Sequence, residues 1–326
     1  MNTPFLKNKS FLYILLFIVM IAIPLITNRY WTDVASTAMF YILLALGLNI
    51  IVGYAGLLDL GYSAFFAVGS YTTGILTTQF GVSFWISIFL GAIFATVLGV
   101  LIGIPTLRLR SDYLAIVTLG FGEIIRLIAN NSKFTGGASG IYGIPKPKIG
   151  SFVFQSNVLL YYLMFIFVLL AIFVIWRLGN SRVGRAWKYI REDEDAAEAM
   201  GVNGLYYKLL AYGLGAMFGG LAGSLFAVKM SAIAPESFGF MQSAMILLAV
   251  VLGGIGRISG VILGAVLVIL LPEAMRSFSD WRIFLFGVLL VLTMIFRPNG
   301  LWPSKKETEE MDDPEPLKGG SKSVVS

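Results

Sequence analysis

Long apolar runs alternate with short polar breaks along this 326-residue chain. A helix needs roughly 20 mostly apolar residues to cross a bilayer. Runs near that length predict ten spans, at residues 11–27, 34–52, 62–80, 84–105, 113–130, 158–176, 206–228, 240–252, 261–271 and 283–296. Several runs are short or interrupted by glycine, which puts the number of spans at eight to ten. The pattern predicts an all-α integral membrane protein, a compact bundle of about ten transmembrane helices.

The ends of the chain differ from this apolar body. Residues 1–10 are polar and precede the first run, which we expect to be a retained helix. The alternative, a signal peptide, lacks support because no small-x-small cleavage site follows the run. Residues 304–326 are charged and poor in apolar side chains, which predicts a disordered tail. The transmembrane domain is therefore placed at residues 11–303.

Composition narrows the chemistry. Only 13% of the residues are charged and 57% are hydrophobic, whereas soluble domains carry about 25% charged residues. Cysteine and histidine are both absent from the sequence, which excludes disulfides, thiol nucleophiles and imidazole acid–base catalysis. No pair of carboxylates is spaced for catalysis, so a membrane enzyme is the least favoured class. The net charge of +6 fits basic loops facing the cytoplasm better than nucleic-acid binding.

The most polar internal stretch is 177–203, RLGNSRVGRAWKYIREDEDAAEAMGVN, which is basic first and acidic afterwards. Such a segment must lie in water on one side of the membrane. Basic residues concentrate on the side that also holds both chain ends, which predicts cytoplasmic termini and a cytoplasmic stretch. One interpretation is a solvated amphipathic helix held at the lipid surface. The other is a short helix that inserts into a cleft on a cytoplasmic motor protein.

Two glycine-rich segments have open interpretations. Residues 131–157, with TGGASGIYGIPKP at their centre, are expected to form an external loop. This loop is either a well-ordered cap on the bundle, or a docking surface for an external partner or the rim of a substrate path. The segment GYAGLLDLGYSAFFA around Asp59 is either a tight turn or a broken helix facing the path. Small residues also recur at four-residue spacing, which predicts close helix packing; they are Gly215, Gly219 and Gly223.

Polar side chains inside the apolar runs are costly in lipid and are therefore candidates for the translocation path. Glu123 and Arg126 are three residues apart and can pair on one helix face. The candidates for the path are Asn49, Asp59, Tyr71, Thr118, Glu123 and Gln242.

The chain contains no G-x-x-x-x-G-K-[ST] phosphate-binding loop. If transport is driven by ATP, a separate polypeptide must bind and hydrolyse it, and this chain binds no cofactor itself.

The segments GYAGLLDLGYSAFFAVGSY, RLRSDYLAIVTLGFGEIIR, TGGASGIYGIPKP, REDEDAAEAMGVN, YKLLAYGLGAMFGGLAGSLFA, GGIGRISGVILGA and RPNGLW occur in this order. Together they resemble the LivM-type permease subunits of branched-chain amino acid ABC importers. The D-A-A-x-x-x-G spacing resembles the E-A-A-x-x-x-G coupling loop of such permeases, with Asp195 in place of the first glutamate. The resemblance implies contact with the ATPase through Asp195, Ala196, Ala197 and Gly201.

The same resemblance implies a type II ABC importer permease-like fold in a bacterial plasma (inner) membrane. The implied partners are a second homologous permease, two ABC ATPase subunits, a periplasmic substrate-binding protein and the lipid bilayer. Urea and short-amide permeases share much of the pattern, which leaves the substrate open between these cargoes and branched-chain amino acids. Two other function classes compete with this one. An ATP-independent secondary transporter would give no reason for the D-A-A-x-x-x-G segment. A purely structural subunit would be recognised because the complex would still transport without it.

Overall fold

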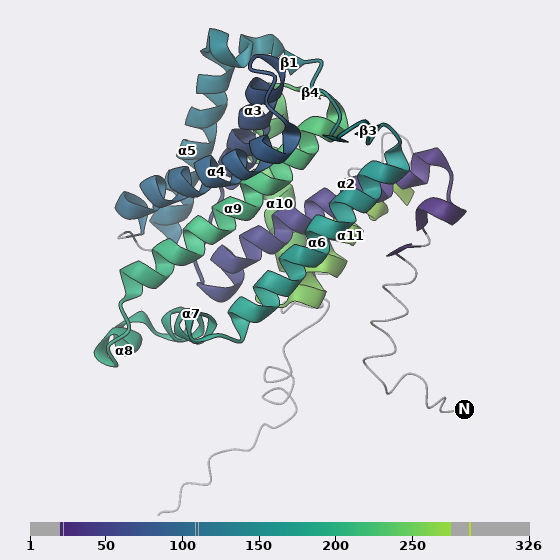
Figure 1. Ribbon diagram of the computed structural model, residues 1–326. Coiled ribbons are helices and arrows are strands. Elements are labelled where there is room, and N and C mark those ends of the chain that lie inside the picture. Colours follow the sequence, from purple (N-terminus) through teal and green to yellow (C-terminus); the bar gives the residue numbers. More distant parts are fainter. Residues whose placement is uncertain (1–19, 22, 108, 110, 275–286, 288–326) are drawn as a thin grey trace, which may run out of the picture.

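The computed structural model describes residues 20–21, 23–107, 109, 111–274 and 287, and its helices form one bundle (Figure 1). In chain order the main helices are α2 (Arg29–Leu48), the π-helix η2 (Asn49–Tyr54), α3 (Ser63–Thr78), α4 (Phe84–Thr106), α5 (Ser111–Asn131), α6 (Asn157–Gly179), α7 (Arg182–Glu192), α8 (Glu194–Ala199), α9 (Gly204–Met230), α10 (Phe240–Gly253) and α11 (Ile258–Ala274). The short elements are η3 (Lys133–Thr135), η4 (Gly137–Ser139), η5 (Pro235–Phe238), β1 (Ile141–Tyr142), β2 (Lys148–Ile149), β3 (Phe152–Val153) and β4 (Ala232–Ile233).

Eight of the ten predicted spans fall on helices of the described residues, and the first and last, 11–27 and 283–296, lie largely outside them. Helices α3 and α11 have 16 and 17 residues, at or below the lower limit for crossing a bilayer. The count of about ten spans stays a prediction. Among the described residues, six helical stretches are long and apolar enough to cross a membrane: Arg29–Tyr54, Phe84–Thr106, Tyr113–Asn131, Asn157–Gly179, Gly204–Met230 and Pro235–Gly253.

Helix α2 and η2 form the central segment of the bundle. Their most apolar window is 89% buried, whereas the corresponding window of α5 is 28% buried. Helix α2 packs against α6, α9, α10 and α11, so its apolar residues are covered on several sides. Helices α4, α5 and α6 instead leave large apolar side chains exposed, as expected for faces turned toward lipid or another subunit.

Helices α3, α4 and α9 approach one another closely where small residues meet. A Cβ built on Gly69 would lie 2.1 Å from the Gly220 oxygen, and one built on Gly223 would lie 2.2 Å from the Phe66 oxygen. Ser70 Oγ donates a hydrogen bond to the Gly223 oxygen at 2.9 Å. Close backbone approach of this kind is how helices pack without a hydrophobic driving force. The small-residue spacing on α9 therefore does pack helices, as predicted.

Between η2 and α3 the chain leaves helical geometry for residues 55–62, where Gly56 has φ +71°. Asp59 is fully buried in this break, and its Oδ1 accepts a hydrogen bond from Gly61 N at 2.7 Å. A Cβ on Gly61 would lie 1.9 Å from the Thr118 oxygen of α5, so the break is pressed against that helix. Irregular backbone is tolerated at membrane depth when it is buried in protein. The segment is therefore an irregular, buried connection between two helices, and its position beside a translocation path stays a prediction.

The connection between α5 and α6 covers the end of the bundle opposite α7 and α8 (Figure 1). Strand β1 pairs antiparallel with β4, with Ile141 opposite Ile233, and Ile144 N donates to the Ser231 oxygen at 3.1 Å. Strands β2 and β3 form a second small ladder within the same connection. The α5–α6 connection is thus hydrogen-bonded to the residues that follow α9.

Candidate functional site

The polar stretch 177–203 folds into α7 and α8 at one end of the bundle (Figure 1). Ser181 precedes α7, and its Oγ accepts a hydrogen bond from Gly184 N at 3.3 Å. Asp193 separates the two helices, and its Oδ1 accepts from Ala196 N at 2.9 Å. Serine and aspartate are preferred at helix N-caps because they satisfy free N–H groups in this way. The stretch that was expected to act as a coupling loop is therefore mostly helical.

The D-A-A-x-x-x-G spacing corresponds to a defined helix stop. Gly201 has φ +85°, and its N–H donates to the Glu198 oxygen at 2.9 Å. Val202 N donates to the Ala197 oxygen at 3.0 Å. These two bonds form a Schellman motif, which requires a left-handed residue immediately after the helix cap. Glycine adopts that conformation without the steric cost that a Cβ brings, which explains the residue at position 201.

The four predicted coupling residues lie together on α8 and its stop. Ala197 is 1% exposed and faces the protein, whereas Asp195, Ala196 and Gly201 are exposed. Met200, beside Gly201, is 68% exposed. The tip of α8 therefore presents a short, mixed apolar and acidic surface that nothing in the described chain covers.

One ion pair joins α8 to α9. Lys208 of α9 is 7% exposed, and its Nζ lies 2.5 Å from Oε2 of Glu194. Burial makes an unpaired ammonium group costly, so Glu194 compensates the charge of Lys208. The pair sits beside the first turns of α9, where the chain turns back from α8.

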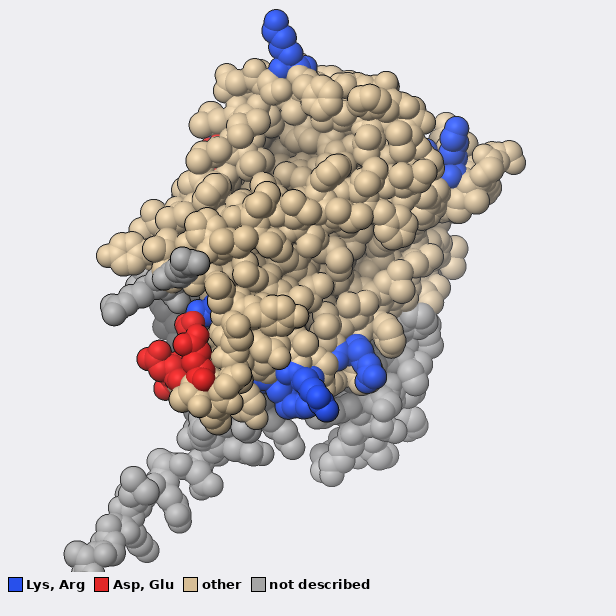
Figure 2. Space-filling view, turned by 60° about the vertical axis from the view of Figure 1, so that its left-hand side comes forward, with Lys and Arg blue, Asp and Glu red and all other residues tan. Residues whose placement is uncertain are grey.

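Charged side chains gather at this end of the molecule (Figure 2). Exposed acidic residues form one patch and exposed basic residues lie beside it, with a broad uncharged belt between this end and the opposite one (Figure 2). The basic members on α7 and just before it are Arg177, Arg182, Arg185, Lys188 and Arg191, and the acidic members are Glu192, Asp193, Glu194, Asp195 and Glu198. The division into a basic half and an acidic half agrees with the sequence.

The buried face of α7 makes contacts that the sequence analysis did not identify. Trp187 is fully buried, its Nε1 donates to the Tyr207 oxygen at 2.7 Å, and its ring stacks on Tyr54 of η2. Arg191 donates from NH1 to the Gly53 oxygen at 2.7 Å. In the sequence, Arg191 is only one member of a basic cluster, and a contact between residues so far apart in the chain has no local signal.

The structure brings some of the candidate path residues together. Thr118 Oγ1 accepts a hydrogen bond from Leu60 N at 3.1 Å, which places it beside the break that contains Asp59. Asn49 lies on η2, and its Oδ1 accepts from Gly256 N at 2.8 Å. These contacts connect Thr118 of α5 to the break at residues 55–62, and Asn49 of η2 to the turn between α10 and α11.

The remaining candidates lie toward α10 and η5. Glu123 Oε2 pairs with Arg126 Nε at 2.7 Å, which confirms the expected i,i+3 pairing, and Glu123 Oε1 accepts from Phe240 N at 3.3 Å. Gln242 Oε1 accepts from the Tyr41 hydroxyl at 3.1 Å. These polar groups have protein partners. Their presence beside a translocation path stays a prediction.

Some buried polar atoms of the described residues lack a hydrogen-bond partner. They include Asn49 Nδ2, the Tyr71 hydroxyl and Thr73 Oγ1, all on α2–η2 or α3. An unsatisfied buried polar group costs about 1–3 kcal/mol, and water is a common partner at such positions. A separate hollow of about 360 Å³ opens between the beginnings of α2 and α6, but none of the six candidate path residues lines it.

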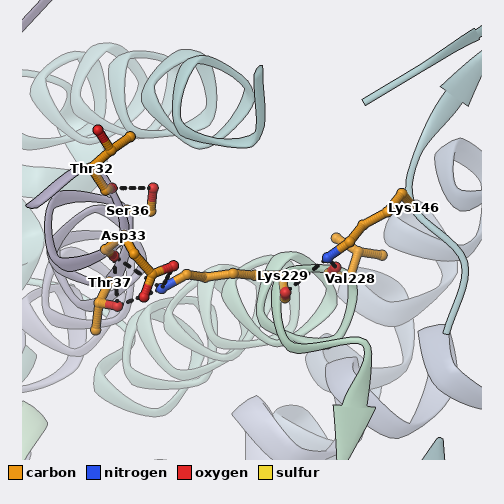
Figure 3. A network of polar contacts seen from close by, with 7 residues as sticks. All are labelled: Thr32, Asp33, Ser36, Thr37, Lys146, Val228 and Lys229. Carbon is orange, nitrogen blue, oxygen red and sulfur yellow. Dashed lines mark hydrogen bonds and ion pairs between the residues drawn. The ribbon is translucent and has the colours of Figure 1, made fainter. Parts of the chain in front are cut away.

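At the opposite end of α9, lysines bind backbone carbonyls and an acidic side chain (Figure 3). Lys146 Nζ donates to the Val228 and Lys229 oxygens at 2.7 and 2.9 Å. Lys229 Nζ lies 3.5 Å from Asp33 Oδ1 and also donates to Thr37 Oγ1. Burial lowers the pKa of Lys146 below its usual value, against an opposing effect of the Asp33 carboxylate. The α5–α6 connection is thereby bonded to the last carbonyls of α9.

Within the described residues no group of three side chains is arranged to hold a metal ion.

The family model described as "Branched-chain amino acid transport system / permease component" matches residues 30–296. No solved structure matches the chain.

Curated relatives include permeases of named transport systems. The high-affinity branched-chain amino acid transport system permease protein LivM of Salmonella typhimurium is 43% identical, over 91% of this chain and 75% of the relative. LivM of Escherichia coli matches with the same identity and coverage. The permease protein LivH of Escherichia coli is 25% identical, over 80% of this chain and 90% of its own length. Given the apolar helices and this match over most of its length, the chain is a multi-pass membrane protein that belongs to the family of branched-chain amino acid transport system permease components.

Proposed function

We propose that this chain is the permease subunit of an ATP-driven importer that moves leucine, isoleucine and valine across a bacterial inner membrane. The observation that carries the proposal is 43% identity with LivM over 91% of this chain. The importer would combine this chain with a second permease of the same family, two ABC ATPase subunits and a periplasmic substrate-binding protein. Similarity to both LivM and LivH supports the pairing of two different permeases.

The α7–α8 end is assigned to the cytoplasm, together with both chain termini. Five basic residues on and just before α7 support this orientation, because Lys and Arg accumulate in cytoplasmic segments of membrane proteins. The opposite end, with the β1–β4 ladder, then faces the periplasm and offers the surface where the loaded binding protein docks.

Helix α8 is the proposed contact with an ATPase subunit. Its exposed tip, with Asp195, Ala196, Met200 and Gly201, is short enough to enter a cleft, and Lys208 anchors its base through Glu194. Closure of the ATPases around ATP displaces α8, and the two permeases rock to open the path outward. ATP is bound by the partner subunits, so the permease contributes the surface that they displace rather than a nucleotide-binding site.

The cargo passes along a path formed with the second permease. Unpartnered polar atoms on Asn49 and Tyr71 support a wetted region near α2 and α3. Glu123 and Gln242 lie farther along, on α5 and α10. The permease needs little affinity of its own, because the binding protein supplies the selected cargo.

The test is substrate-stimulated ATP hydrolysis by the complete complex in proteoliposomes. With the binding protein present, we expect leucine, isoleucine and valine each to raise the ATPase rate and to accumulate in the lumen, whereas urea does neither. Stimulation by urea and not by leucine would contradict the proposed substrate. Equal leucine uptake with ATP omitted would contradict the ATP-driven mechanism and favour a secondary transporter.

A further inference from the structure

Three segments that are distant in sequence meet at the side chain of Arg191. This residue lies in the last turn of α7, and its NH1 donates to the Gly53 oxygen of η2 at 2.7 Å. A Cβ on Gly56 would lie 2.8 Å from Arg191 Cγ, and one on Gly256 would lie 3.1 Å from Arg191 NH1. The guanidinium therefore contacts the end of η2 and the turn at residues 254–257 at the same time.

The two segments that Arg191 contacts also bind each other. Gly256 N donates to Asn49 Oδ1 at 2.8 Å, and a Cβ on Gly53 would lie 2.7 Å from Gly256 N. Gly256 has φ +83°, which a residue with a Cβ adopts only with strain. Both sides of this contact depend on glycine, and any side chain at these positions would push η2 and the 254–257 turn apart.

Both contacted segments interrupt the helices of the bundle. The π-helix η2 ends α2 and leads into the break before α3, while the 254–257 turn joins α10 to α11. Irregular backbone between rigid helices absorbs conformational change, and π-helical turns are frequent at functional positions. Because the Arg191 guanidinium contacts both interruptions, it affects the relative positions of the helices on either side of them, α2, α3, α10 and α11.

The face of α7 that carries Arg191 makes a second contact with η2, through Trp187. Trp187 lies one turn earlier, and its ring stacks on Tyr54 with centroids 6.3 Å apart and planes 12° apart. The other basic residues nearby make no comparable contact among the described residues: Arg185 NH1 reaches the Asn180 oxygen at 3.5 Å, within its own segment. Arg191 is therefore distinguished from its basic neighbours by geometry rather than by charge.

We propose that Arg191 is a positioning residue that transmits displacement of α7 and α8 to the two helix interruptions, η2 and the 254–257 turn. The proposal rests on the proposed function, in which α8 contacts an ATPase subunit. When α8 moves, the hydrogen bond to the Gly53 oxygen and the packing against Gly56 and Gly256 make both interruptions follow α7. Without the guanidinium, α7 keeps its Trp187 contacts, but the 254–257 turn loses its direct connection to it.

The test compares Arg191→Ala, Arg191→Lys and Arg185→Ala in the complete complex, reconstituted with the binding protein. The readout is labelled leucine transported per ATP hydrolysed. We expect Arg191→Ala to lower this ratio at least about fivefold, the lower end of typical coupling effects, while leucine-independent ATP hydrolysis continues. Arg191→Lys keeps a charged donor and should recover part of the ratio, and Arg185→Ala removes the same charge and should match the unchanged protein. A normal ratio for Arg191→Ala would overturn the proposal.

A distance measurement decides the question if Arg191→Ala fails to assemble. The chain contains no cysteine, so spin labels can be placed by Lys188→Cys and Ile255→Cys, both at exposed positions on α7 and in the 254–257 turn. We expect the distance between the labels to stay the same in resting and vanadate-trapped complexes, because the segments move together. A change of more than about 5 Å, the size of a one-turn shift, would overturn the proposal. The proposed function itself fails separately, if leucine does not stimulate the unchanged complex.

Discussion

Helix α9 carries a buried or half-buried lysine contact at each end, and the two contacts differ in kind. Near its beginning, Lys208 pairs with Glu194, a side chain on the short helix α8. At its end, Lys146 from the α5–α6 connection, which is external in the proposed orientation, donates to two carbonyls of the last turn. The last carbonyls of a helix have no intrahelical partners, and a cation there also interacts favourably with the helix dipole. The α8 contact at the beginning of α9 is thus side chain to side chain, whereas the α5–α6 connection bonds the backbone of its last turn.

The difference extends to the surrounding hydrogen bonds. At the external end, the β1–β4 ladder and the bond from Ile144 N to the Ser231 oxygen add backbone contacts beside Lys146. At the other end, α8 is connected to α9 through the Gly201 stop and the Glu194–Lys208 pair. From this comparison we expect the α5–α6 connection to move with α9, and α8 to change its angle to α9 more readily. A lever that responds to a partner needs the second kind of attachment.

The largest effect on leucine uptake is expected from changing the helix stop at Gly201, which lies at the α8 end of this comparison. Gly201→Val places a β-branched residue at φ +85°, where such residues are outliers. Left-handed geometry costs a residue with a Cβ roughly 1–2 kcal/mol, so α8 should be redirected and leucine uptake should fall about tenfold. The measurement is leucine uptake by cells, normalised to the amount of permease in the membrane.

Gly201→Asn is the matched control for that variant. Asparagine tolerates the left-handed region better than other residues with a Cβ, and a Cβ at this position meets no atom within 4 Å. Uptake should therefore remain close to normal with Gly201→Asn. If Gly201→Val also transported normally, the assignment of this helix stop to coupling would be wrong.

Much of the fold could be predicted because the apolar runs are long and their period is simple. Eight predicted spans coincide with helices, and the close packing of α3 with α9 follows from small residues at four-residue spacing. The π-helix could not be predicted, because NIIVGY continues the apolar run of α2 without any local sign of a wider turn. The residues that bond to it, Gly256 and Arg191, approach from elsewhere in the chain.

The candidate site was predictable only where its chemistry is local. The D-A-A-x-x-x-G spacing encodes a helix and its stop within a few residues, so Asp195 to Gly201 could be identified from sequence. Lys208, by contrast, is a single basic residue near an apolar run, and only the fold shows that it is buried against Glu194. Arg191 was grouped with four similar residues, because charge alone does not reveal which of them bonds to the backbone of a distant helix.

A milder change tests the side chain contact at the beginning of α9. Glu194→Gln removes the partner charge and leaves Lys208 buried without compensation. Because the Glu194 side chain is 45% exposed, solvent screens the pair and the expected loss is about 0.5–1 kcal/mol. Backbone amides of α8 should exchange hydrogen two- to fivefold faster in the detergent-solubilised protein.

Glu192→Gln is the control for the ion pair, since it removes an exposed carboxylate close to the pair in sequence without touching Lys208. It should leave the exchange of α8 unchanged. Equal acceleration by Glu192→Gln and Glu194→Gln would indicate a general charge effect and remove the distinction drawn between the two ends of α9.

The smallest effect is expected at the external end, because several backbone bonds remain when one lysine is removed. Lys146→Met deletes two hydrogen bonds to the Val228 and Lys229 oxygens but leaves the β1–β4 ladder in place. A partly exposed charged hydrogen bond of this kind contributes about 1 kcal/mol, so the amide of Ile144 should exchange at most about fivefold faster. Lys148→Met, two residues along, removes an exposed lysine and should change nothing, because Trp85 bonds its backbone oxygen and not its side chain. Leucine uptake should stay near normal in both variants. A loss of uptake with Lys146→Met as large as that with Gly201→Val would show that the external attachment, and not only α8, transmits the conformational change.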